Sequence, residues 1–169
     1  MQTNKSQRNV KIISEIHPQF LGSTNEIKRV ILQSKIGGSD YVKVQLYNSK
    51  KLFNNQDREY LEISKNELKD IKKFSEDHGI ELTASIFDEE RLDWCEDLNF
   101  SLYKIASRTL NEDKKLCEKI ISTNKETIIS LGMYDISKGA PYLEKNIKYL
   151  YCVSKYPTAL TEIDMPNFE

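Results

Sequence analysis

Short apolar runs rich in β-branched residues alternate along this chain with polar stretches. Six of these runs predict strands, at residues 11–16, 41–46, 81–87, 102–106, 127–131 and 147–153. Between them, apolar residues recur three and four positions apart, as Ile27, Val30 and Ile31 do within residues 24–35, which predicts amphipathic helices. An unbroken alternation of strand and helix is typical of a parallel sheet with crossover helices.

Polar residues mark the expected helix ends. Ser23 precedes the first predicted helix, and Ser64 with Glu67 has the spacing of a capping box. Asn111 is the predicted opening residue of a later helix that contains Leu116. The tract 48–60 predicts a long loop, which is a common location for substrate-binding elements.

Two parallel architectures fit this alternation, an open doubly wound sheet and a closed (β/α)8 TIM-type barrel. Neither Gly-x-Gly-x-x-Gly after the first strand nor a P-loop is present. Polar residues cluster near the carboxyl ends of the predicted strands, where barrel enzymes keep their active sites. These residues are Glu15, Lys43, Gln45, Ser85, Lys104, Ser107, Ser130 and Ser154. A full barrel takes about 250 residues, so we expect about six of its eight βα units here.

Lys43 and Lys104 are the strongest chemical signal, because a lysine on a buried strand face is costly unless its ammonium is paired. Both would suit a phosphate or carboxylate on a small substrate, with strand-end serines as neutral donors. In the alternative interpretation each lysine pairs with a carboxylate such as Glu15 inside the core. A Schiff-base role for one lysine, as in aldolases, is a further alternative.

Composition narrows the function classes. With 25 Lys+Arg against 26 Asp+Glu the net charge is −1, which argues against general nucleic-acid binding and a polybasic membrane contact. No apolar run approaches the roughly 20 residues that span a bilayer, and the N-terminus has no secretory signal pattern. The three cysteines are odd in number and far apart, so we expect reduced thiols and a cytoplasmic protein.

The two histidines, His17 and His78, are too far apart to build a metal site by themselves. His78 precedes Gly79 and is expected at a solvated helix end. His17 follows the first strand, where binding and structural roles are equally open. Tyr156 follows the last strand, where it could bind a sugar or simply pack.

In family order the chain contains motifs that resemble the N-terminal barrel of the sialic acid synthase family, which includes the N-acetylneuraminate, legionaminate and pseudaminate synthases. The motifs span nearly the whole chain, and the most specific are Lys104-Ile105-Ala106-Ser107 and Cys152-Val153-Ser154-Lys155-Tyr156-Pro157. The others are Ser14-Glu15-Ile16, Val42-Lys43-Val44-Gln45, Leu61-Glu62-Ile63-Ser64, Ala84-Ser85-Ile86-Phe87-Asp88 and Ser130-Leu131-Gly132-Met133.

This resemblance implies condensation of phosphoenolpyruvate with an N-acetylated sugar aldehyde, such as N-acetylmannosamine, to give a sialic-type acid and phosphate. It implies a homodimer and a divalent cation, Mn2+ or Mg2+. By motif position, Lys43, Ser85, Lys104, Ser107 and Ser130 would hold phosphoenolpyruvate, with Gln45 beside them. Glu15 would line the reaction centre, and Ser154 and Tyr156 would contact the sugar.

The chain also departs from the family pattern. The first loop, usually Glu-Ile-Gly-x-Asn-His-x-Gly, reads Glu15-Ile16-His17-Pro18-Gln19-Phe20-Leu21-Gly22 here. The sequence stops before the last two strands, the histidines that bind the metal and the C-terminal antifreeze-like domain, so we expect residues 1–169 to be the N-terminal portion of such a barrel, with the cation's ligands outside it. A second hypothesis is therefore a non-catalytic anion- or sugar-binding barrel protein that needs a partner chain.

Overall fold

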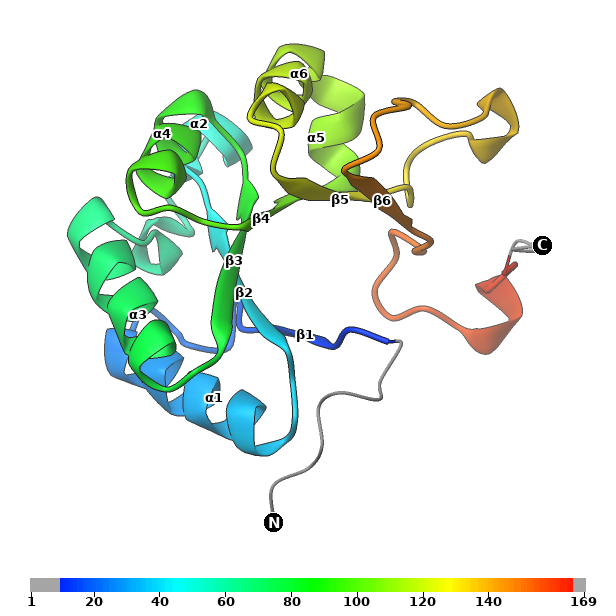
Figure 1. Ribbon diagram of the computed structural model, residues 1–169. Coiled ribbons are helices and arrows are strands. Elements are labelled where there is room, and N and C mark those ends of the chain that lie inside the picture. Colours follow the sequence, from blue (N-terminus) through cyan, green and yellow to red (C-terminus); the bar gives the residue numbers. More distant parts are fainter. Residues whose placement is uncertain (1–9, 166–169) are drawn as a thin grey trace. The chain divides into compact units, whose positions relative to one another are not determined.

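The computed structural model describes residues 10–165 (Figure 1). Six strands are present in this part of the chain: β1 (Ile13–Glu15), β2 (Tyr41–Leu46), β3 (Glu81–Ile86), β4 (Leu102–Ile105), β5 (Glu126–Ser130) and β6 (Ile147–Leu150). They hydrogen bond in the order of the sequence, from β1 to β6, in one sheet. The pairs β1–β2, β3–β4, β4–β5 and β5–β6 are all parallel, which confirms the predicted parallel α/β fold.

Helices connect these strands. They are α1 (Thr24–Ile36), α2 (Ser49–Phe53), α3 (Lys65–Asp77), α4 (Glu89–Asp97), α5 (Ser107–Glu112) and α6 (Lys114–Ser122), with short 3-10 turns at Glu59–Leu61, Ile136–Lys138 and Leu160–Glu162. The chain divides into two compact units, Met1–Thr83 and Ala84–Glu169, with the boundary inside β3. Among the helices of residues 10–165, none has the length and apolarity needed to span a bilayer.

In the first unit, β1 and β2 carry the sheet and α1 packs beside α3 (Figure 1). Ile27 and Ile31 of α1 and Leu68 and Ile71 of α3 are buried, so the apolar stripes seen in the sequence are the faces that the two helices bury. The Ser23 side chain accepts the backbone N–H of Glu26 and so caps α1 as expected.

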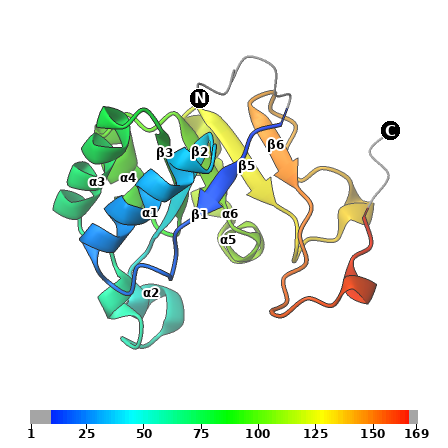
Figure 2. The ribbon, with the colours of Figure 1, turned by 90° about the horizontal axis from the view of Figure 1, so that it is seen from below.

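In the second unit, β5 and β6 run side by side in the same direction (Figure 2). β5 is almost entirely buried, whereas β6 alternates between half-buried and exposed positions. Strands of a parallel sheet are normally covered on both faces. β6 and the segment that follows it are therefore the least covered part of this unit.

Several predicted elements were wrong in detail, among them the first strand, which spans only Ile13–Glu15 rather than residues 11–16. Residues 48–60 are not a plain loop, because Asn48 caps the short helix α2 through the backbone N–H of Lys51. Asn111 does not open the fourth helix, since it lies inside α5 and Asp113 caps α6 instead. The last strand ends at Leu150 rather than residue 153.

Candidate functional site

The parallel register of β1 and β2 brings Glu15, at the carboxyl end of β1, next to Lys43 in the middle of β2. The two residues are direct partners in the parallel register, and the Lys43 ammonium forms an ion pair with Glu15 Oε2. Lys43 is only 7% exposed, whereas the Glu15 side chain is 38% exposed. A buried ammonium needs such a partner. For Lys43, the structure therefore contains the ion pair with Glu15 that the sequence analysis gave as the alternative interpretation.

An aromatic cluster beside this pair contains a histidine that the sequence left undecided. The buried His17 ring lies 5.5 Å from the ring of Phe20 and 5.4 Å from that of Tyr47, and its Nε2 is 3.2 Å from the Tyr47 hydroxyl. The His17 backbone N–H donates to Glu15 Oε1 at 3.3 Å. Burial lowers the pKa of His17 to about 4, with Lys43 and Arg58 acting in the same direction against Glu15.

Burial also keeps the neighbouring phenol neutral, because it raises the pKa of Tyr47 to about 12. His17 and Tyr47 therefore face each other as two uncharged groups at neutral pH. Among the described residues, His17 Nδ1 is one of two buried side-chain nitrogens without a hydrogen-bond partner. In the sequence, the one indication that His17 could belong to the site was its position directly after the first predicted strand.

The second unit gathers the other lysine with strand-end serines. Ser85 of β3 and Lys104 of β4 are direct partners in the parallel register, so their Cα atoms are neighbours across the sheet. Ser85 and Ser130 are buried, and Lys104 is half-buried. Neutral hydroxyl donors beside an ammonium group form a suitable environment for a small anion.

Ser107 connects this group of residues to the chain beyond β5 and β6. Its Oγ accepts the backbone N–H of Gly132 at 3.1 Å and lies 3.5 Å from the Sγ of Cys152. Ser154 approaches the same glycine closely. The sequence proposed Ser107 and Ser154 as site residues, whereas Gly132 and Cys152 were named only as parts of motifs, because their contacts with Ser107 join residues 25 and 45 positions apart.

The remaining predicted site residues lie nearer the surface. Gln45 is half-buried on β2, and Ser154 is exposed. Tyr156 is 96% exposed, so its side chain is not enclosed by the part of the chain described. His78 is the exposed C-cap residue of α3, as predicted, and its Nδ1 contacts the Phe74 carbonyl at 2.7 Å.

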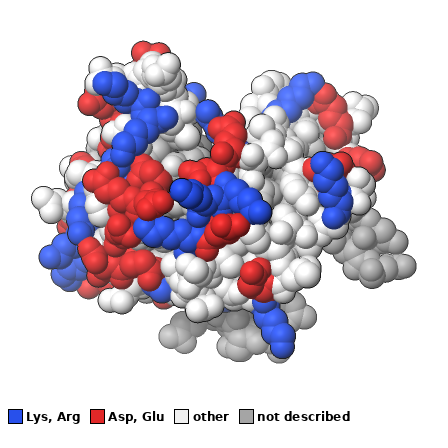
Figure 3. Space-filling view, turned by 90° about the horizontal axis from the view of Figure 1, so that it is seen from above, with Lys and Arg blue, Asp and Glu red and all other residues white. Residues whose placement is uncertain are grey.

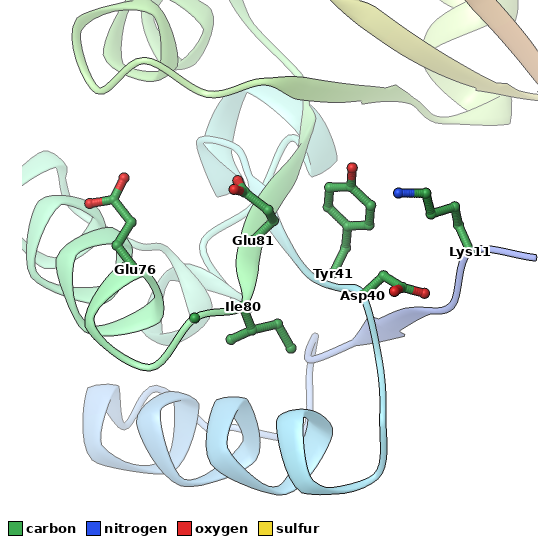
Figure 4. A pocket seen from close by; sticks show the side chains of 7 residues that line it. Lys11, Asp40, Tyr41, Glu76, Ile80 and Glu81 are labelled. Carbon is green, nitrogen blue, oxygen red and sulfur yellow. The ribbon is translucent and has the colours of Figure 1, made fainter. Parts of the chain in front are cut away.

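A cavity of about 470 Å³ lies at the opposite ends of the strands. Its lining includes Asp40 and Tyr41 at the start of β2 and Glu81 at the start of β3, with Lys11 reaching toward Tyr41 at 5.6 Å from the ring centre (Figure 4). None of the predicted site residues lines this cavity. Parallel α/β proteins bind ligands at the carboxyl ends of strands, so we do not assign the candidate site to it.

Charged side chains on the surface largely neutralise one another. Figure 3 shows a face on which basic and acidic side chains are interleaved. Between α4 and α6, for example, Lys119 pairs with Glu89 at 2.9 Å and lies 3.7 Å from Asp93. Within residues 10–165, no group of three or more His, Cys, Asp or Glu side chains is arranged to hold a metal ion.

Two enzymes are similar to this chain in sequence over most of its length. Human N-acetylneuraminate-9-phosphate synthase is 26% identical over 91% of the chain and 49% of its own length. Pseudaminic acid synthase of Campylobacter jejuni is 28% identical over 95% of the chain and 54% of its own length. The chain thus spans about half the length of the curated relatives it matches.

A solved structure extends the similarity to three dimensions. The sialic acid synthetase of Leptospira borgpetersenii, solved with citrate, superposes with a TM-score of 0.80 at 25% identity, covering 92% of this chain and 58% of that one. The family model of the NeuB family matches residues 30–169. This match covers most of the chain, including the strand-end residues from Lys43 to Tyr156, and the chain therefore belongs to the NeuB family.

Proposed function

We propose that this chain is part of an enzyme that condenses phosphoenolpyruvate with an N-acetylated sugar aldehyde. The reaction forms one carbon–carbon bond, consumes one water and releases phosphate together with a sialic-type acid. The observation that carries the proposal is the pairing of Ser85 with Lys104 at adjacent strand ends in a member of the NeuB family. N-acetylmannosamine or a related sugar is the proposed acceptor.

Phosphoenolpyruvate is a small trianion, so its recognition requires cations and hydrogen-bond donors held in fixed positions. In the second unit, we assign this role to Lys104 with the hydroxyls of Ser85, Ser107 and Ser130. Hydrogen bonds to charged groups are roughly twice as strong as neutral ones. Donors held in place by the fold also need little rearrangement when charge shifts during the reaction.

In the first unit, we assign Lys43, by its place in the family motif, to an anionic group of phosphoenolpyruvate, and Glu15 to the orientation of the water or the aldehyde. The ion pair between them holds the Glu15 side chain in place, so one residue supports the other. Gln45 lies two positions from Lys43 on β2 and shares its side of the strand. Ser154 and Tyr156 are the proposed sugar contacts.

The wider proposal follows from the family. About six of the eight βα units of a (β/α)8 barrel would be present in residues 1–169, and the enzyme would be a cytoplasmic homodimer. A divalent cation, Mn2+ or Mg2+, would act through ligands outside this chain. The described residues do not fit such an ion, so the roles assigned above use only the chain's own side chains.

A calorimetric titration with phosphoenolpyruvate tests the proposal. We expect Lys104→Ala to weaken binding by about 10- to 100-fold, because a hydrogen bond to a charged group contributes roughly 1.5–3 kcal/mol. Lys148→Ala is the matched control, since Lys148 also lies on a strand of the second unit but is exposed and pairs with Glu126. Equal affinity of wild type and Lys104→Ala would contradict the assignment of Lys104.

A second candidate function is supported by the surface of the second unit. No residue from 131 to 165 is buried, and this stretch carries the exposed apolar residues Met133, Ile136, Leu143, Leu150, Tyr156, Leu160, Ile163 and Met165. Exposed apolar residues of this kind are available for contact with a partner chain, as an anion- or sugar-binding protein that works with such a chain would require.

Light scattering after size-exclusion chromatography, combined with a product assay, separates the two candidates. Phosphoenolpyruvate binding without product, in an oligomer of defined size, would support the binding protein. Product formation from phosphoenolpyruvate and N-acetylmannosamine would support the enzyme. A polydisperse sample would count against the binding protein, because an uncovered parallel edge promotes aggregation.

A further inference from the structure

The carboxylate of Glu15 is held at both of its oxygens. The Lys43 ammonium pairs with Oε2, and the backbone N–H of His17 donates to Oε1 at 3.3 Å. The ion pair alone would let the carboxylate turn about its contact with Lys43, and the 38% exposure of the Glu15 side chain leaves it room to do so. The hydrogen bond from His17 is therefore the contact that fixes the direction in which Glu15 faces.

This hydrogen bond depends on the loop that follows β1. Its length of 3.3 Å is just beyond the usual range of about 2.7–3.2 Å, so a small movement of the loop would break it. The peptide that carries the His17 N–H also carries the Ile16 carbonyl, which accepts the Gln19 backbone N–H at 3.0 Å. Within residues 17–22, only the side chains of His17 and Phe20 are buried, so these two side chains anchor the loop.

The anchor joins the loop to the chain directly after β2. The His17 ring packs against Phe20 and Tyr47, and its Nε2 lies 3.2 Å from the Tyr47 hydroxyl. In either tautomer of a neutral histidine, one of these two atoms donates to the other. Burial keeps both groups uncharged at neutral pH, because it lowers the pKa of His17 to about 4 and raises the pKa of Tyr47 to about 12. Tyr47 is held in turn, edge-on to the ring of Phe53 at 5.4 Å.

Packing alone does not explain a histidine at this position. Among the described residues, the buried Nδ1 of His17 has no hydrogen-bond partner, and an unpaired buried polar atom is costly. An apolar ring would fill the space between Phe20 and Tyr47 without that cost. What the imidazole adds to such a ring is Nε2, the atom that meets the Tyr47 hydroxyl.

We infer that His17 is a positioning residue for Glu15, whose ring, anchored on Tyr47, keeps its own backbone N–H on the carboxylate and so fixes how Glu15 meets the water or the aldehyde. This inference rests on the proposed function. Phosphoenolpyruvate is assigned to lysine and serine side chains rather than to Glu15. Loss of the anchor should therefore slow the reaction without weakening the binding of phosphoenolpyruvate.

Steady-state kinetics with phosphoenolpyruvate and N-acetylmannosamine test the inference. Tyr47→Phe removes the hydroxyl and keeps the ring, so kcat should fall by about 2- to 10-fold, the equivalent of one neutral hydrogen bond, while KM for phosphoenolpyruvate stays within about 2-fold. In a His17→Ala background, Tyr47→Phe should have no further effect. His17→Gln, whose amide still reaches the Tyr47 hydroxyl, should keep kcat within about 2-fold of wild type. An unchanged kcat in Tyr47→Phe, or a loss that appears in KM instead, would overturn the inference.

Ile71→Val is the matched control for a loss of stability. Ile71 is fully buried on α3 in the same unit, so this substitution removes one methylene from the core and destabilises the fold. It should leave kcat unchanged at temperatures where both variants are folded. A decrease in kcat equal to that of Tyr47→Phe would mean that stability, and not the position of Glu15, controls the rate.

A measurement without substrate separates this inference from the proposed function. A backbone N–H held in a hydrogen bond exchanges slowly with solvent, so Tyr47→Phe should speed hydrogen exchange of the His17 amide several-fold, as followed by NMR. The amide of Ile31, buried in α1, is the internal reference and should not change. Equal exchange of the His17 amide in wild type and Tyr47→Phe would refute the anchor. If wild type forms no product while Tyr47→Phe still speeds the exchange, the proposed function fails but the anchor stands.

Discussion

The ion pair of Glu15 and Lys43 is asymmetric, because one partner is buried and the other reaches water. Lys43 is 7% exposed and the Glu15 side chain 38% exposed. Removing the carboxylate would leave a buried ammonium without this partner, which is the costly way to break such a pair. Removing the lysine would leave a carboxylate that water can still solvate.

We therefore expect Glu15→Ala to lower the free energy of unfolding by about 1–3 kcal/mol, less than for a fully buried pair because water reaches Glu15. Urea unfolding followed by circular dichroism measures this difference. Asp70→Ala is the matched control, since Asp70 pairs with Lys28 at the surface and its loss should cost at most about 1 kcal/mol. Equal effects of both substitutions would show that burial of Lys43 contributes little.

His17 makes stability depend on pH. Its pKa is lowered from 6.5 to about 4 in the folded chain, so between these values the unfolded chain binds more protons than the folded one. The contribution of a neutral His17 to the free energy of unfolding is therefore fully present above about pH 6.5. It is lost as the pH drops toward 4, by up to about 3 kcal/mol.

The matching experiment compares His17→Gln with His78→Gln in urea titrations at several pH values. Glutamine cannot titrate, so the slope between pH 6.5 and 4 should flatten in His17→Gln. His78 is an exposed helix-end residue, and its replacement should leave the slope unchanged. A wild-type slope in His17→Gln would mean that other groups cause the acid sensitivity.

Among the elements, α3 has the most complete N-terminal cap. The Ser64 side chain accepts the Glu67 backbone N–H, and the Glu67 side chain accepts the Ser64 backbone N–H at 2.9 Å. The hydrogen bond with Ser64 also lowers the pKa of Glu67. Both halves of the predicted capping box are thus confirmed.

Ser64→Ala should destabilise the chain by about 1 kcal/mol, as N-cap replacements do. Ser122→Ala, at the exposed end of α6, provides the comparison, and it should change stability by less than about 0.5 kcal/mol. Thermal unfolding measured by circular dichroism is sufficient for both variants. If the two variants unfold at the same temperature, the box does not stabilise the fold.

Element types could be predicted from the sequence wherever local pattern and burial agree. The run at residues 41–46 alternates little because both faces of β2 are covered, and its predicted bounds match those of the strand. The α2 helix has only five residues, too few to show a helical period. Asn111 and Asp113 are both good caps, and only the tertiary structure selects Asp113.

The site residues that could be proposed from the sequence are likewise those whose position depends on local pattern. The residues Ser85 and Lys104 could be proposed because each ends a strand, and parallel register makes them neighbours. The cluster of Ser107, Gly132 and Cys152 could not, because it depends on how the chain returns after β5 and β6. The His17–Tyr47 contact likewise joins residues 30 positions apart.

At the scale of the whole molecule, burial is distributed unevenly along the chain. Buried residues occur in every strand from β2 to β5, yet none is found among residues 131–165, shown from yellow to red in Figure 1. The family match nevertheless extends through this stretch to residue 169. Residues 131–165 therefore match the family in sequence although the chain's own side chains bury none of them.

Local stability should follow this distribution, because segments with few buried apolar contacts open at low free energy. We expect backbone amides of residues 131–165 to exchange with deuterium at least about tenfold faster than those of β3, β4 and β5 in the same unit. Peptide-level exchange followed by mass spectrometry makes the comparison within one sample, with β5 as the internal reference. Protection of residues 131–165 equal to that of β5 would mean that something absent from the described chain, such as a second copy, covers them. Repeating the exchange at lower protein concentration then tests whether a second copy is responsible, since protection by a second copy is lost on dilution.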